Sequence, residues 1–247
     1  MKPYYITEYP DVLNTKVIAV PIFENNYVYV LTDNSHRCLI VDPGLPEPVC
    51  EIVKNLKLQP THLLITHSHP DHIGGVDRVI DIYPEILKID FSNCPAENNF
   101  FTFSDRSFKV FKTPGHLPDH ICFLELTQKI LFCGDILFRF GCGRIFDGTY
   151  AELFQSMQLL KALPSETQVY CTHEYTQQNL AFCVKNSLVV EADFSQAEKD
   201  GVYNVPSLPV ALAVELKYNP FLKAKSLNEL TKLRILRNEF HVEAKNS

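Results

Sequence analysis

The chain has 247 residues, of which 46% are hydrophobic and 21% are charged, and its formal net charge is −6. This length and composition are typical of a globular protein with its own core, and they exclude a mini-protein and a mostly disordered chain. The acidic balance argues against a broad nucleic-acid surface, and no uncharged apolar run reaches the roughly 18 residues of a membrane span. The first ten residues lack an apolar signal core. We therefore expect a cytoplasmic protein without nucleic-acid or membrane partners, and we expect it to be a monomer.

The eight cysteines are spread along the chain without a CxxC pair or a regular spacing. A chain of this length does not need a disulfide framework to fold. We expect these cysteines to be buried, reduced thiols.

Short strands are predicted through the first two thirds of the chain, where β-branched and aromatic runs alternate with turn residues. The predicted strands are residues 16–20, 27–31, 38–42, 62–66, 107–112, 120–126, 129–133 and 168–171. Apolar residues at three-to-four spacing predict helices over 48–57 and 74–83, and the capping box that begins at Thr149 predicts a third helix to about Leu163.

After His173 the apolar pattern becomes helical, with stripes over 177–190 and 208–216 and a second capping-box sequence that begins at Ser226. Strands that share the chain with helices predict an α/β (α+β) fold, in which packed sheets are flanked by helices. We expect the residues after His173 to form a small helical appendage.

The strongest functional signal is the run from Thr66 to Gly75, which lies where a predicted strand ends and a helix begins. His67 and His69 alternate in an extended segment and so point to the same side, while the following turn lets Asp71 and His72 face a second position nearby. Imidazole and carboxylate groups are ligands that zinc and similar ions accept. A coincidental polar loop is a poor alternative explanation for four such side chains within six residues.

Three more candidate ligands lie at predicted strand ends, namely His116, Asp135 and His173. Each of them alone is more simply explained as a hydrogen-bonded loop residue. Together with the first cluster they supply five imidazoles and two carboxylates, which are enough for a two-metal site in which Asp135 bridges the ions.

The order of these motifs resembles the metallo-β-lactamase superfamily, which implies an αβ/βα sandwich with the metals at one edge. Within it the chain is similar to glyoxalase II, the hydroxyacylglutathione hydrolases. This resemblance covers nearly the whole chain, and it implies a catalytic domain at 1–173 and a helical glutathione-binding domain at 174–247. The motifs that carry it are Asn25-Asn26-Tyr27, Gly134-Asp135, Gly141-Cys142-Gly143-Arg144, Asp147-Gly148-Thr149, Thr172-His173-Glu174-Tyr175, Asn179-Leu180, Glu215 and Asn219-Pro220-Phe221.

The resemblance implies that His67, His69 and His116 hold one ion, that Asp71, His72 and His173 hold the other, and that Asp135 bridges them. It also implies glutathione contacts from Arg144, Phe146, Tyr175, Arg234 and Arg237. Three departures from the family pattern concern Phe146 in place of Tyr, Arg237-Asn238 in place of Lys-Asp, and Asp119 in place of Gly. The last of these puts the backbone of that loop in question. The other histidines, His36, His62, His120 and His241, are expected to have structural roles.

The charge distribution supports an anionic substrate independently of the family. Residues 217–247 carry seven basic and three acidic side chains, so this segment is +4 and the rest of the chain is −10. Arg234 and Arg237 are three residues apart and so lie on one helical face, where they suit the carboxylates of a tripeptide. A solvated helix surface is the alternative explanation.

The implied reaction is hydrolysis of S-(2-hydroxyacyl)glutathione thioesters such as S-lactoylglutathione, the second step of methylglyoxal detoxification. We expect two divalent ions, with zinc as the first choice and iron or manganese as alternatives. They would lower the pKa of a shared water, and the resulting bridging hydroxide would attack the carbonyl. Asp71 would also orient that hydroxide. The enzymatic alternative is a mononuclear-iron persulfide dioxygenase of the same fold, and the non-enzymatic one is a metal-stabilised binding protein.

Overall fold

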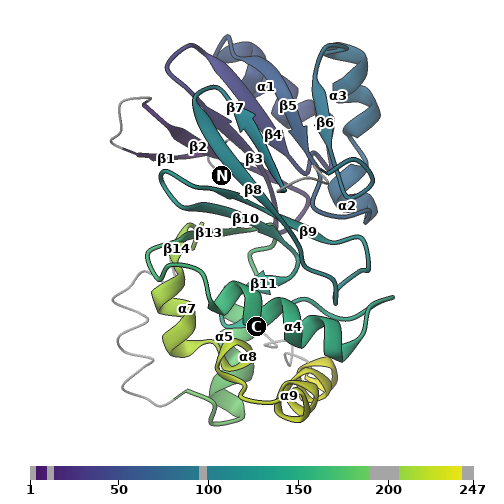
Figure 1. Cartoon of the computed structure of the whole chain (residues 1–247), viewed down its shortest axis with the longest axis vertical. Helices are drawn as coiled ribbons and strands as arrows, with labels where there is room; N and C mark the ends of the chain where they lie inside the picture. Colours follow the sequence, from purple (N-terminus) through teal and green to yellow (C-terminus); the bar gives the residue numbers. More distant parts are fainter. Residues whose placement is uncertain (1–3, 10–13, 95–98, 190–205, 241–247) are drawn as a thin grey trace, which may run out of the picture.

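Two six-stranded sheets form the centre of the fold, with helices on their outer sides (Figure 1). The computed structural model describes residues 4–9, 14–94, 99–189 and 206–240. The metallo-β-lactamase αβ/βα sandwich expected from the sequence is confirmed.

The first sheet has the strand order β1-β2-β3-β4-β5-β6. Strands β1 to β4 are antiparallel and follow one another in the chain, whereas β4, β5 and β6 are parallel. Parallel neighbours need crossover connections, and these contain α1 (Pro46–Asn55), α2 (Pro70–Ile73) and α3 (Val76–Ile82). The strands are β1 (Tyr5–Glu8), β2 (Lys16–Ile22), β3 (Asn26–Thr32), β4 (Arg37–Val41), β5 (Gln59–Leu64) and β6 (Leu87–Ile89).

The second sheet has the order β14-β13-β10-β9-β8-β7. A separate two-stranded ribbon of β11 (Leu137–Phe138) and β12 (Gly141–Cys142) follows β10, and α4 (Tyr150–Lys161) then leads back to β13, which is parallel to β10. The sheet strands are β7 (Phe100–Phe103), β8 (Arg106–Lys112), β9 (Ile121–Glu125), β10 (Ile130–Gly134), β13 (Gln168–Cys171) and β14 (Val210–Ala211).

Two apolar cores follow from the alternation of side chains across the strands. One core lies between the sheets and includes Leu31 and Phe123, and it continues under the C-terminal helices to Phe182 and Leu230. The other lies between the first sheet and the apolar stripe of α1, which contributes Val49 among others. Because both faces of the first sheet are covered, every residue of β3 is buried.

The C-terminal helices pack below the second sheet, together with α4 (Figure 1). They are α5 (Thr176–Lys185), α7 (Leu212–Tyr218), α8 (Pro220–Lys223) and α9 (Leu227–Glu239). Glu215 of α7 joins them to the ribbon, because its carboxylate accepts a hydrogen bond from the Phe140 backbone N–H at 2.9 Å and lies 3.3 Å from Nε of Arg139. Asn219 donates to the carbonyl of Phe138 at 3.0 Å. This buried polar network fixes the helices against the ribbon that follows Asp135.

The prediction of a helix over 208–216 is wrong at its start, because Val210–Ala211 forms β14 beside β13 and the helix begins at Leu212. Pro209 lacks the N–H that a helix interior needs, and pairing with an edge strand satisfies the backbone instead. The helix expected over 177–190 ends at Lys185, and Ser187 has a φ of +54°. Residue 190 lies outside the described residues.

Both predicted caps are present. Thr149 and Glu152 form the full capping box of α4. Ser226 accepts from the Glu229 N–H at 3.2 Å, but the Glu229 carboxylate bonds to the N–H of Lys225.

No helix in the described parts of the chain combines the length and the apolar composition needed to cross a bilayer.

Candidate metal centre and adjoining pocket

All seven side chains predicted as metal ligands lie together at one edge of the sandwich. They come from loops or short helices directly after strands, where a rigid sheet holds each loop in place. His67 and His69 follow β5, Asp71 and His72 belong to α2, His116 follows β8, Asp135 follows β10 and His173 follows β13.

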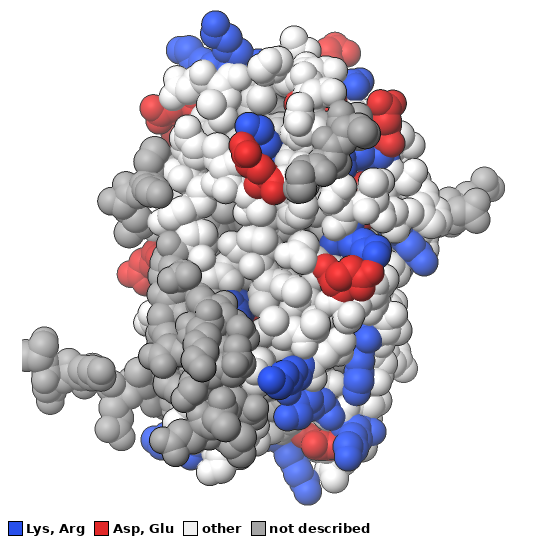
Figure 2. Space-filling view, turned by 90° about the vertical axis from the view of Figure 1, so that its left-hand side faces the viewer, with Lys and Arg blue, Asp and Glu red and all other residues white. Residues whose placement is uncertain are grey.

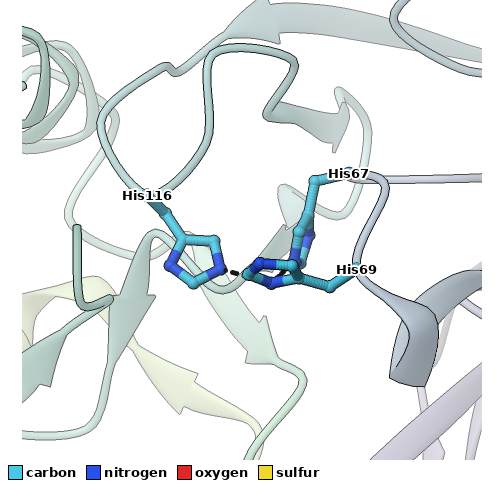
Figure 3. A group of neighbouring side chains, drawn as sticks. All are labelled: His67, His69 and His116. Atoms are coloured by element: carbon cyan, nitrogen blue, oxygen red, sulfur yellow. Dashed lines mark hydrogen bonds between the residues drawn. The ribbon is translucent and has the colours of Figure 1, made fainter. Parts of the chain in front are cut away.

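The first group comprises His67, His69 and His116, whose imidazoles point toward one another (Figure 3). Nδ1 of His69 lies 3.0 Å from Nε2 of His67 and 2.9 Å from Nε2 of His116. Three ring nitrogens this close form a site for a single ion with nitrogen ligands.

The second group comprises Asp71, His72 and His173. Oδ2 of Asp71 lies 3.4 Å from Nε2 of His173 and 3.7 Å from Nε2 of His72. One carboxylate and two imidazoles therefore face a second position.

Asp135 lies between the two groups. Its Oδ2 is 3.1 Å from Nε2 of His173 and 3.8 Å from Nε2 of His116, and its Oδ1 is 3.4 Å from Nε2 of His72. The carboxylate thus reaches imidazoles of both groups, which is the placement that a bridging ligand requires.

Four of the five imidazoles are oriented by a partner at Nδ1, so that Nε2 faces the centre. An outer partner of this kind fixes the tautomer and the direction of a metal-binding histidine. The partners are Thr66 Oγ1 for His67 at 3.0 Å, Asp42 Oδ2 for His72 at 3.0 Å, the Arg144 carbonyl for His116 at 2.6 Å and Asn25 Oδ1 for His173 at 2.9 Å. His69 differs, because its Nδ1 faces the centre.

Asp42 is a functional residue that the sequence analysis missed. It follows β4 with a φ of +51°, and its carboxylate accepts hydrogen bonds from the N–H of Thr66 at 2.8 Å, the hydroxyl of Thr66 at 2.6 Å and His72. In the sequence, Asp42 ends the predicted strand 38–42 and precedes Pro43-Gly44, a pair typical of a turn. Its position at a strand end is the signal that could have identified it.

Asn25 and Asn26, which belong to one of the motifs shared with the family, connect the two sheets at the site. Asn26 Nδ2 donates to Asp71 Oδ2 at 2.8 Å, and Asn26 also forms a β-bridge with His173. The backbone N–H of Glu174 donates to the Asn25 carbonyl at 2.7 Å. Asn25 and the first residue of β3 therefore position one ligand that follows a strand of each sheet.

The electrostatic environment differs between the two groups. Burial lowers the pKa values of His67 and His116, so both rings stay neutral with a lone pair available. Burial alone would also lower the pKa values of His72 and His173, but the charge of Asp135 and hydrogen bonds to carboxylates, joined at His72 by the charge of Asp42, together outweigh it and raise them to about 10 and about 9. Burial would raise the pKa of Asp135, yet His173 and His72 hold it well below its usual range.

Two buried atoms of the cluster make no hydrogen bond among the described residues, namely Nε2 of His72 and Oδ1 of Asp135, which face each other at 3.4 Å. A buried polar atom without a partner costs about 1–3 kcal/mol, so such atoms require an explanation. Both point into the cluster, and a cation with nitrogen and oxygen ligands would satisfy them. The residues present therefore fit divalent metal ions.

His120, which was expected to have only a structural role, lies in direct contact with two of the metal-ligand candidates. Its ring is fully buried and stacks on His67, with ring centroids 5.0 Å apart. The Asp135 N–H donates to His120 Nε2 at 3.1 Å, and the Nδ1–H donates to Thr113 at 2.9 Å. Gly134, with a φ of +47°, leaves room for this contact, since a Cβ there would lie 2.8 Å from Nε2 of His120.

Replacing His120 by alanine is expected to weaken metal binding about tenfold or more, because the buried Asp135 N–H loses its acceptor. At saturating metal the variant should still bind as much metal as the wild type. Titration with a competing chelator measures the affinity. An unchanged affinity would contradict the positioning role.

His62 and His36 lie away from the cluster. His62 stacks on Phe101, with centroids 5.8 Å apart, and its Nδ1 lies 2.9 Å from Oγ1 of Thr61. His36 occupies a turn with a φ of +61°. His241 lies outside the described residues.

A pocket of about 250 Å³ lies beside the second ligand group. Arg144, Tyr175, Arg234 and Arg237, four of the five predicted glutathione contacts, line it, and its lining contains no carboxylate. Tyr175 connects the pocket to the cluster, because its ring stacks on His173 with centroids 4.7 Å apart and an interplanar angle of 2°. A cationic pocket in contact with a metal ligand suits an anionic molecule with its reactive group at the metals.

Phe146 does not line this pocket. Its ring is 55% exposed and lies against His69 and His116, at centroid distances of 4.8 Å and 5.3 Å. It is therefore placed at the edge of the first ligand group.

The two helical arginines are held differently. Arg234 is only 5% exposed, and its guanidinium donates to the Cys142 carbonyl at 2.7 Å and to Asn238 at 3.1 Å. Arg237 is half-buried and donates from Nε to Asn179 at 3.1 Å. Figure 2 shows Lys and Arg side chains gathered over the lower part of one face, at the end where Figure 1 places the C-terminal helices.

Comparison with known families gives two matches along the chain. The metallo-beta-lactamase superfamily matches residues 21–89 and 84–173, and the hydroxyacylglutathione hydrolase C-terminus matches residues 174–241. The hydroxyacylglutathione hydrolase of Psychromonas ingrahamii is 38% identical over 232 residues, which cover 88% of this chain and 90% of that protein. The protein of the same name from Bdellovibrio bacteriovorus is 36% identical, over 90% of this chain and 97% of its own.

Solved structures share the fold at lower identity. ETHE1 from Myxococcus xanthus has a TM-score of 0.65 at 23% identity, covering 94% of this chain and 90% of its own. The BLEG-1 B3 metallo-beta-lactamase has a TM-score of 0.63 at 22% identity, covering 89% of this chain and 100% of its own. Likeness at this level concerns the fold alone.

Proposed function

The chain belongs to the metallo-β-lactamase superfamily and, within it, to the hydroxyacylglutathione hydrolases, and on this basis we propose that it hydrolyses S-(2-hydroxyacyl)glutathione thioesters such as S-lactoylglutathione. The products are glutathione and a 2-hydroxy acid, as in the second step of methylglyoxal detoxification. The observation that carries the proposal is the stacking of Tyr175 on His173, because it joins a cationic pocket to the metal-ligand cluster.

The His/Asp cluster indicates divalent metal ions, and we propose two of them, with zinc as the first choice and iron or manganese as alternatives. His67, His69 and His116 would hold one ion, Asp71, His72 and His173 the other, and Asp135 would bridge them. When bound, such ions supply an acidified water and a Lewis acid for a carbonyl oxygen.

Asp71 is proposed to orient the attacking water through a carboxylate oxygen. Burial would raise its pKa, but the hydrogen bond from His173, the His72 charge and the hydrogen bond from Asn26 outweigh burial and lower it. Asp71 therefore stays ionised at neutral pH and can only accept a hydrogen bond, which suits an orienting role and excludes it as an acid for the leaving group. The departing glutathione thiolate needs little acid assistance.

The cationic pocket is proposed to hold the glutathione part of the substrate, with Arg144 and Arg237 directed at its carboxylates. Arg234 already bonds to the protein backbone, so its main contribution is positive charge and support of the Cys142 segment. Tyr175 would contact the substrate between the pocket and the metals. Phe146 would cover the first ligand group from the solvent side.

We propose that residues 1–173 form the catalytic domain and that residues 174–247 form the glutathione-binding domain. We also propose that the protein is a cytoplasmic monomer and that it has no nucleic-acid or membrane partners. Size-exclusion chromatography with light scattering tests the oligomeric state.

Three measurements on one preparation test the function: metal analysis, hydrolysis of S-lactoylglutathione, and oxygen uptake with glutathione persulfide. Two metal ions per chain with thioester hydrolysis and no oxygen uptake are expected. One iron per chain with oxygen uptake would instead support the dioxygenase, and bound metal without turnover of either substrate would support a binding protein.

Removal of metal by a chelator is expected to abolish hydrolysis and to lower the melting temperature by several degrees, because the buried atoms of His72 and Asp135 lose their partner. Adding zinc back should restore both. A melting temperature that chelation does not change would argue against a metal held by these buried ligands.

A further inference from the structure

A second pocket, of about 350 Å³, borders the metal-ligand cluster at one of its ligands. Its wall includes the ligand His67, and it shares no residue with the cationic pocket, which reaches the cluster through Tyr175. His67 and His173 belong to different ligand groups, so the two pockets contact the cluster at different ligands. The acyl group of a thioester whose glutathione part fills the cationic pocket is therefore a candidate occupant of this second pocket.

The floor of this second pocket is apolar. Ile65 and Val76 are buried there, while Ile73 and Phe91 are 37% and 38% exposed beside them. The ammonium of Lys112 lies 5.0 Å from the Phe91 ring centroid, a cation–π contact that favours the observed ring position. A partly exposed apolar surface inside a pocket gains free energy when an apolar group covers it.

The lining of this pocket carries three carboxylates, Asp77, Asp90 and Asp119, and one ammonium, Lys88, and the Lys112 ammonium lies beside it over Phe91. Lys88 is paired with Asp90 at 2.9 Å, whereas Asp77 and Asp119 take part in no ion pair among the described residues. Asp119 is also absent from the residues with positive φ, so the loop does not need glycine at this position and tolerates the carboxylate. A carboxylate on the incoming group would be repelled by the unpaired carboxylates of Asp77 and Asp119.

We propose that this pocket receives the acyl group of the substrate, and that it favours uncharged acyl groups bulkier than lactoyl over acyl groups that carry a carboxylate. The proposal rests on the proposed thioester hydrolysis. It assigns two new specificity-determining residues, Phe91 for apolar contact and Asp119 for exclusion of anions.

The first test compares S-mandeloylglutathione with S-lactoylglutathione as substrates. The aromatic mandeloyl group is expected to contact the Phe91 ring, whereas the small lactoyl group should fill less of the pocket. For Phe91→Ala, the ratio of kcat/KM for the mandeloyl to the lactoyl substrate should fall about five- to tenfold. The matched control is Leu126→Ala, which removes an exposed apolar side chain outside the pocket and should leave this ratio unchanged.

The second test uses S-succinylglutathione, whose acyl group ends in a carboxylate. Replacing Asp119 by asparagine keeps the size of the side chain and removes its charge. The kcat/KM for this substrate, relative to that for S-lactoylglutathione, should rise about three- to tenfold at low ionic strength, and the gain should shrink as salt is added.

These outcomes separate the two proposals. If the wild type hydrolyses S-lactoylglutathione but neither variant changes its substrate ratio, the acyl pocket is refuted and the thioester hydrolase stands. If the wild type hydrolyses no glutathione thioester, the proposed function itself fails. A ratio that changes equally in Leu126→Ala also overturns the assignment of Phe91.

Discussion

Replacing Asp135 by alanine is expected to lower kcat/KM for S-lactoylglutathione on the order of 10³-fold or more and to remove at least one metal ion per chain. Its carboxylate oxygens lie within 3.8 Å of ring nitrogens of His72, His116 and His173, so the change removes a ligand from both groups. It also leaves His72 and His173 without the charge that raises their pKa values. Metal analysis and steady-state kinetics measure both effects.

The matched control is Asp81→Ala, which removes an exposed carboxylate from α3 and should change neither metal content nor rate. Because the Asp135 variant loses a buried ion pair, its melting temperature has to be recorded alongside its activity. A folded Asp135→Ala protein with two metal ions and a wild-type rate would remove Asp135 from the site.

The grouping of the seven metal-ligand candidates could be predicted from local rules. His67 and His69 alternate along an extended segment, and His116, Asp135 and His173 each follow a strand whose pattern is clear in the sequence. Parallel pairing of β10 with β13 brings Asp135 and His173 to the same sheet edge. Strand ends and sheet pairing together determine the cluster.

The outer partners could not be predicted, because they depend on contacts between distant segments. Asp42 and His72 are 30 residues apart in the chain, and Asn25 and His173 are 148 apart. The acceptor role of His120 toward the Asp135 N–H likewise depends on how β9 and β10 pair. No local pattern distinguishes these residues from ordinary turn or core residues.

Short elements also escaped prediction for a physical reason. β14 has two residues and exists only because β13 offers a free edge, and α2 is a single turn that begins at Pro70. Arg234 and Arg237 were assigned one role on the basis of helical spacing. Their contacts differ, since one guanidinium is buried against a backbone carbonyl and the other is half-buried at the pocket.

Truncation of Arg237 to alanine is therefore the sharper test of glutathione recognition, and it is expected to raise KM about tenfold with little change in kcat. Contacts to a remote part of the substrate hold the ground state and the transition state about equally. A charge-assisted contact contributes roughly 1.5 to 3 kcal/mol, and partial exposure of Arg237 reduces this. In the double variant that also carries Arg234→Ala, KM should rise about a hundredfold. Its melting temperature should also fall, because the Cys142 carbonyl loses its donor.

Two controls separate recognition from damage to the fold. Lys232→Ala removes an exposed charge from the same helix and should leave KM unchanged. A neutral thioester without the tripeptide should be hydrolysed by Arg237→Ala at nearly the wild-type rate, since the metal ligands are untouched. If Arg237→Ala hydrolyses glutathione thioesters with the wild-type KM, the cationic pocket does not bind the tripeptide, and the anionic part of the substrate must bind elsewhere.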